Sequence, residues 1–96
     1  MSTKEAYKQK MEGELELAQA KLAEFKAQAK SSAADVRIKY AKQVDELEQK
    51  VDATKGKLKE LGEASDDAWE QIKVGVESAW GVLSAAIQNA AAKFKG

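Results

Sequence analysis

Large apolar residues recur along the first two thirds of the chain at steps of three and four residues. The series begins with Tyr7, Met11, Leu15, Leu22 and Phe25 and continues through Val36, Tyr40, Val44, Leu47, Val51, Leu58 and Leu61, and the smaller residues Ala18, Ala29, Ser32 and Thr54 fill the gaps. This spacing places the residues on one side of an α-helix and does not match the alternation of a strand. It is close to a heptad repeat, which is typical of a long helix that pairs with another helix through a seam.

The end of this long helix is indicated by Gly62, which follows Leu61 at the position where a left-handed residue often closes a helix. Ser65 then stands where an N-cap is expected, and Asp66 and Asp67 favour the first turn of a new helix. A connection this short makes the two helices antiparallel neighbours. The sequence therefore predicts a helix over 3–61, a turn over 62–65 and a shorter helix over 66–94.

A second break is indicated by Ser32 and Asp35, whose spacing matches a capping box. It would divide the chain near 31–34 and give a three-helix bundle. No glycine or proline occurs between Glu14 and Lys55, however, and the apolar pattern continues through this region. We therefore favour one all-α domain over 1–96, an antiparallel helical hairpin or coiled coil, with the three-helix bundle as the alternative.

The shorter helix carries a narrow apolar stripe with an 11-residue repeat, seen in "DAWEQIKVGVE" and "SAWGVLSAAIQ". Its members are Trp69, Ile72, Val76, Trp80, Leu83, Ile87 and Phe94. One interpretation is that the stripe forms the hairpin core against the preceding helix. The other is a membrane or granule surface, because tryptophans on such a stripe suit a lipid interface. Few lysines flank the stripe, so lipid binding would be conditional on opening of the hairpin.

The two predicted helices differ in length, and the difference predicts self-association. At 1.5 Å per residue the first would be about 88 Å long and the second about 43 Å. The second helix could then cover only half of the first, and would leave one part of the seam exposed. That part consists of Tyr7, Met11, Leu15, Leu22 and Phe25. We expect a second copy to cover it in a homo-oligomer.

The composition argues against catalysis. The chain has no histidine or cysteine, so the usual bases, nucleophiles and transition-metal ligands are missing. We predict no catalytic, cofactor-binding or metal-binding residue, no small-molecule substrate and no enzymatic activity. The 16 basic and 16 acidic residues balance, which disfavours nucleic acid as a partner. The first residues resemble no signal peptide and no apolar run is long enough to span a bilayer, so we expect a cytoplasmic protein, at most peripheral to a membrane.

Three stretches carry a resemblance to a known group of proteins: "STKEAYKQKMEGELE", "YAKQVDELEQK", and "SDDAWEQIKVGVESAW" followed by "AAAKFKG". With these, the chain resembles small bacterial coiled-coil proteins that are often labelled stress-response proteins. The resemblance implies a cytoplasmic helical hairpin with a link to stress and no assigned enzymatic activity. It implies no particular functional residues.

Overall fold

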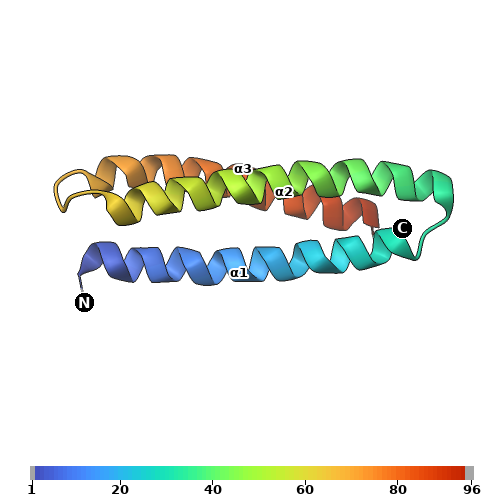
Figure 1. The fold of residues 1–96 in the computed structure, drawn as a ribbon, viewed down its shortest axis with the longest axis horizontal. Coiled ribbons are helices and arrows are strands. Elements are labelled where there is room, and N and C mark those ends of the chain that lie inside the picture. The colour runs from blue at the N-terminus through green and yellow to red at the C-terminus, as the bar shows by residue number, and fades with distance from the viewer. Residues whose placement is uncertain (1, 95–96) are drawn as a thin grey trace.

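The computed structural model describes residues 2–94, which form three α-helices and no strand. Helix α1 spans Thr3–Lys30, α2 spans Ala34–Glu63 and α3 spans Trp69–Phe94. The helices run side by side as a bundle of 51 × 19 × 18 Å, with α2 antiparallel to both α1 and α3 (Figure 1). Each of the outer helices contacts α2 more extensively than the two contact one another.

The structure differs from the favoured prediction of one helix over 3–61, because the chain turns between Lys30 and Ala34. This is the break of the alternative, near 31–34. The hydroxyls of Ser31 and Ser32 both donate to the Gln28 carbonyl, at 3.1 and 2.8 Å, and so satisfy the end of α1. Turning here lays the seam of α1 against the rest of the chain, which buries it without a second copy.

The capping box predicted from Ser32 and Asp35 does not form. Ser32 acts at the end of α1, and the N-cap of α2 is Ala33, which makes no side-chain cap bond. The serine therefore marks the break correctly, but for a different reason: it satisfies carbonyls behind it and not amides ahead of it.

Gly62 does not end α2. The helix continues to Glu63, and no residue of the described part has a positive φ, so the prediction of a left-handed Gly62 is wrong. The helix end is satisfied from α1, where the Lys4 ammonium donates to the Ala64 carbonyl at 2.8 Å. Gly62 instead allows close approach, because a Cβ there would lie 3.1 Å from the Lys8 side chain.

Helix α3 begins at Trp69, three residues later than predicted from Asp66 and Asp67. Residues 66–68 form a turn built on Ser65, whose backbone carbonyl accepts from the amides of Ala68 and Trp69 at 3.1 Å each. The connection between α2 and α3 therefore runs over 64–68 in place of 62–65.

The core lies along the axis of the bundle and is built from all three helices. Leu61, Val76 and Leu83 are completely buried at its centre. Thr54 is also completely buried, and its hydroxyl donates to the Lys50 carbonyl of the same helix at 2.8 Å, so its polar group is satisfied. Each large apolar side chain buried here contributes about 1.5–3 kcal/mol to stability.

Candidate interaction surfaces

The seam predicted to bind a second copy lies inside the bundle. Met11, Leu15, Leu22 and Phe25 keep between 2% and 7% of their surface exposed, and Tyr7 packs against the same core as a half-buried residue. The seam is covered by α2 and α3 of its own chain because the chain reverses direction at residues 31–33, after α1. The exposure on which we based the self-association prediction is therefore absent for these five residues.

The stripe of α3 forms core, as the first of its two interpretations required. Trp69, Val76 and Leu83 are buried, while Ile72, Trp80 and Ile87 are half-buried against the same cluster. Phe94 belongs to α3, but its side chain lies outside the described residues. The stripe thus faces α1 and α2 in this structure, and a lipid surface could reach its buried members only if the bundle opened.

An aromatic contact joins the start of α1 to the start of α3. The rings of Tyr7 and Trp69 lie 6.1 Å apart at an interplanar angle of 41°, and the Lys73 ammonium stands 5.0 Å from the Tyr7 ring centre and 5.9 Å from that of Trp69. Burial raises the pKa of the Tyr7 hydroxyl above its ordinary value, and the carboxylate of Glu77 raises it further. Tyr7 therefore stays neutral, and the contact is a structural clamp between two helices.

A shallow groove separates α1 from α3 near the middle of the bundle. Its walls include Leu17 and Lys21 from α1, and Trp80 and Ile87 from α3. Leu17 is 73% exposed, and both α3 residues are only partly covered. The two outer helices contact one another less extensively than either of them contacts α2. In this groove the apolar stripe of α3 reaches the surface beside an exposed apolar side chain of α1.

The outer side of α3, which faces away from both other helices, is also weakly polar. Val74 is 69% exposed and Val82 is 53% exposed, and the intervening Ser78 and Gly81 are exposed as well. No charged residue occurs over 78–92, in a chain of which 33% is charged. A surface helix normally carries its charges on this side, so the face is suited to contact with another apolar surface.

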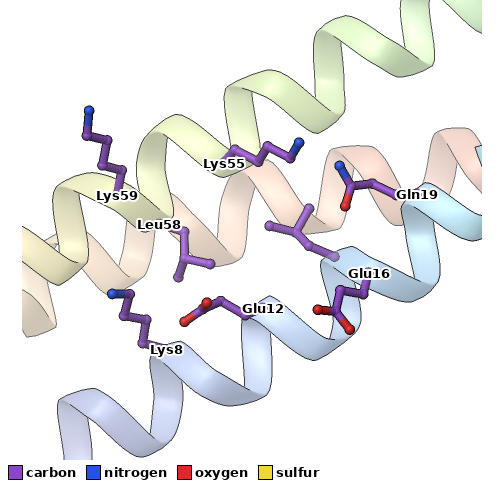
Figure 2. A pocket seen from close by; sticks show the side chains of 8 residues that line it. Lys8, Glu12, Glu16, Gln19, Lys55, Leu58 and Lys59 are labelled. Atoms are coloured by element: carbon purple, nitrogen blue, oxygen red, sulfur yellow. The ribbon is translucent and has the colours of Figure 1, made fainter.

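A second groove, between α1 and α2, has a charged rim. Leu15 and Leu58 form its floor, and its rim is lined by Lys8, Glu12, Glu16, Gln19, Lys55 and Lys59. Figure 2 shows the ammonium groups of Lys55 and Lys59 pointing away from one another. Because the charges of both signs are spread around the rim and do not converge, the groove offers no focused site for an ion.

Two further observations bear on chemistry and location. Within residues 2–94, no three acidic side chains come together in an arrangement that could hold a metal ion. None of the helices described is both long enough and apolar enough to cross a bilayer.

The chain matches no family model, no curated protein and no solved structure in the three comparisons that were made.

Sequence reasoning missed Leu17 as a surface residue of interest. Leu17 falls outside the heptad series, and a large apolar residue outside its own helix's seam is the signal that could have marked it. Val74 and Val82 stand opposite the α3 stripe, on a side where the sequence pattern already lacks charge.

Proposed function

We propose that this chain is a non-enzymatic interaction protein that associates with further copies of itself through exposed apolar helix surface. The observation that carries the proposal is the exposure of Leu17, Val74 and Val82 on a bundle whose core is already filled. Removing branched apolar side chains from water lowers the free energy. Several exposed apolar side chains on neighbouring helices therefore favour association with a protein partner. The seam of α1 takes no part in this association.

Sedimentation velocity of the full chain over about 5 to 500 µM tests the proposal. We expect the weight-average sedimentation coefficient to rise with concentration and to fall again when the concentrated sample is diluted. A monomer across the whole range would overturn self-association as the function.

We further propose that the three-helix bundle is the form of the monomer in solution, in place of the extended hairpin. The covered seam supports it, since a helix over 3–61 would leave Met11, Leu15 and Phe25 in water. Small-angle scattering on dilute protein separates the two forms, because the bundle is 51 Å long and the straight helix alone would be about 88 Å. A maximum dimension near the larger value would contradict the bundle.

A second candidate function is conditional binding to a lipid surface, and the groove between α1 and α3 favours it. Trp80 and Ile87 are only partly covered there, so the apolar stripe could be exposed further if α1 moved away. Tryptophan emission with liposomes tests this function. In a Trp69→Phe variant only Trp80 reports, and a blue shift on adding liposomes would favour lipid, whereas an unchanged spectrum favours the protein partner.

The link to stress response and the cytoplasmic location stay predictions from the resemblance. The link to stress is tested by measuring whether the amount of the protein in cells rises under osmotic or envelope stress. Fractionation of the same cells tests the location.

A further inference from the structure

The turn between α1 and α2 is built from residues that a continuous helix also accepts. Ser31 has φ −89° and ψ 1°, and Ala33 has φ −62° and ψ 156°, so Ala33 departs from helical values only in ψ. Residues 31–33 include no glycine or proline, and no described residue of the chain has a positive φ. Ala33 is the N-cap of α2 and makes no side-chain cap bond. Rotation about a few backbone bonds would therefore join α1 and α2 into one helix.

The apolar seam continues across the turn as it would in a single helix. Ala29, Ser32, Val36 and Tyr40 follow one another at steps of three, four and four residues. Val36 stands on this line but is 37% exposed. The described part of α3 stops short of the turn, so α3 does not cover the first residues of α2 (Figure 1). A joined helix would thus present an uninterrupted seam with an exposed valine near its middle.

We propose that α1 is an exchangeable arm: at high protein concentration two copies open their turns, and each packs its α1 against α2 and α3 of the other. The surface that α1 leaves is the surface that α1 covers in the closed bundle, so the α1 of a second copy re-forms the contacts that were lost. These contacts include the ion pair of Lys26 with Glu48 and the bond from Lys4 to the Ala64 carbonyl. Exchange of identical elements is a low-cost route to a dimer. It goes beyond the proposed association of closed bundles, in which α1 stays in place.

The contacts of α1 with α2 fix the register of the exchanged dimer. Lys26 pairs with Glu48, and Leu15 shares the floor of a groove with Leu58. Both pairs are centred beside Val36 in the sequence. Two joined helices that keep these contacts between copies are therefore antiparallel and are related by a two-fold axis beside Val36. The exposed Val36 of one copy then meets Val36 of the other, and both are removed from water.

Arg37 favours the closed form. Its guanidinium donates to the Ser32 carbonyl at 3.2 Å, whereas in a continuous helix that carbonyl accepts from the amide of Val36. In the exchanged dimer the two Arg37 side chains lie on the same side of the paired helices, next to the two-fold axis, and repel one another. On the opposite side, Asp35 of each copy is level with Lys39 of the other, and these charges attract. Arg37 therefore stabilises the closed turn and disfavours the exchanged dimer.

The balance between the two forms depends on protein concentration. In the exchanged dimer each copy regains the backbone hydrogen bonds that the turn interrupts, and each covers its Val36. Against this, the two copies lose independent motion, and that cost grows on dilution. We therefore expect the closed monomer at micromolar concentration and a measurable exchanged fraction at about 1 mM. Each joined helix, over 3–63, would be about 92 Å long, whereas the closed bundle is 51 Å long.

The decisive experiment determines whether Lys26 pairs with Glu48 of its own chain or of another. Equal amounts of unlabelled and isotopically heavy chain are mixed in urea and refolded together, at about 1 mM or at about 10 µM. A carbodiimide then joins the paired ammonium and carboxylate as an amide, and mass spectrometry identifies the peptides linked through Lys26 and Glu48. Closed bundles give only light–light and heavy–heavy products, whereas exchanged dimers also give light–heavy products. We expect light–heavy products at 1 mM, and at least tenfold less of them at 10 µM.

Ala34→Pro should prevent the exchange and leave the closed bundle intact. Ala34 is the first residue of α2, where a helix leaves the amide without a partner and proline is well tolerated, and Ala33 already has the extended conformation that a following proline requires. A helix that continued through residue 34 would clash with this proline. Thr3→Pro, at the first residue of α1 and preceded by the extended Ser2, is the matched control. We expect light–heavy products at 1 mM to fall to the 10 µM level in Ala34→Pro and to be unchanged in Thr3→Pro.

Arg37→Gln tests the residue that holds the turn. It removes the bond to the Ser32 carbonyl and the repulsion between copies, so we expect the light–heavy fraction at 1 mM to rise at least twofold. An unchanged fraction would overturn the role of Arg37. Urea unfolding followed by circular dichroism establishes that each variant folds.

The outcomes separate the exchange from the association of closed bundles. No light–heavy product from the unaltered chain at 1 mM would overturn the exchange, and so would an equal amount from Ala34→Pro. Sedimentation of Ala34→Pro tests the association of closed bundles by itself, because α1 cannot be exchanged in that variant. If Ala34→Pro stays monomeric while the unaltered chain gives light–heavy products, the exchange stands and the proposed function is overturned.

Discussion

Leu22 and Leu17 provide the sharpest test of where the seam of α1 lies. The two residues are five positions apart on the same helix, but Leu22 is 7% exposed in the core and Leu17 is 73% exposed. Replacing a buried leucine by alanine costs about 2–5 kcal/mol, because the transfer free energy is lost and a cavity remains. The same change at an exposed site usually alters stability by less than about 0.5 kcal/mol.

For Leu22→Ala we expect the free energy of unfolding to fall by about 2–4 kcal/mol. This is slightly less than the largest losses for buried leucines, because the core of a narrow bundle can partly collapse around the cavity. In urea, with an m-value of about 1 kcal/mol/M, the midpoint should fall by about 2–4 M. A thermal midpoint should fall by at least about 8 °C for a chain of this size. Unfolding is followed by circular dichroism at about 5 µM protein, the lowest concentration of the sedimentation series, so that association contributes least, and Leu17→Ala measured in parallel is the control.

The opposite pattern would refute the buried seam. If Leu22→Ala left the unfolding midpoint unchanged at low concentration but abolished self-association at high concentration, then Leu22 would face a second copy. The extended hairpin over 3–61 and 66–94 would then describe the protein better than the bundle.

Two further substitutions test single contacts of the bundle. Lys4→Met removes the hydrogen bond to the Ala64 carbonyl at the end of α2, and should lower the free energy of unfolding in urea by about 0.5–1.5 kcal/mol. Lys10→Met, at an exposed site of the same helix, is the control and should change the free energy of unfolding little. Tyr7→Phe tests the raised pKa of the Tyr7 hydroxyl. A raised pKa stabilises the fold below the unfolded value, about 10, and this contribution is lost as pH rises through the folded value. The free energy of unfolding should therefore fall more steeply above about pH 10 in the unaltered chain than in Tyr7→Phe.

The helical class and the core stripe of α3 could be predicted from the sequence, because both depend on the 3.6-residue period alone. Trp69, Val76 and Leu83 share one side of any helix that contains them, and that side was too apolar to remain in water. The ends of the helices were predicted less well. Gly62 met the usual signal for a helix end, but it lies within α2, beside the Lys8 side chain, and Lys4 reaches from α1 to the Ala64 carbonyl just past the helix end.

Local signals indicated a break near 31–34 but did not decide whether it forms, because that depends on a balance between helix continuity and the burial of residues far apart in the chain. Interrupting a helix for three residues gives up about three backbone hydrogen bonds, each worth a net of about 1 kcal/mol. Burying Met11, Leu15, Leu22 and Phe25 gains about 1.5–3 kcal/mol for each side chain. Burial therefore outweighs helix continuity, although no glycine or proline marks the turn.

A dimer of extended hairpins would bury the same seam without breaking the helix, so the comparison between the two forms depends on concentration. Association costs at least about 4 kcal/mol of translational and rotational freedom at a 1 M standard state, and more at the micromolar concentrations of a cell. That cost is comparable to or larger than the roughly 3 kcal/mol saved by keeping the helix continuous. Covering the seam within one chain is therefore favoured in dilute solution. The self-association that we propose would then use surface that the bundle leaves uncovered, and the outer face of α3, which carries no charged residue over 78–92 and exposes Val74 and Val82, meets that condition.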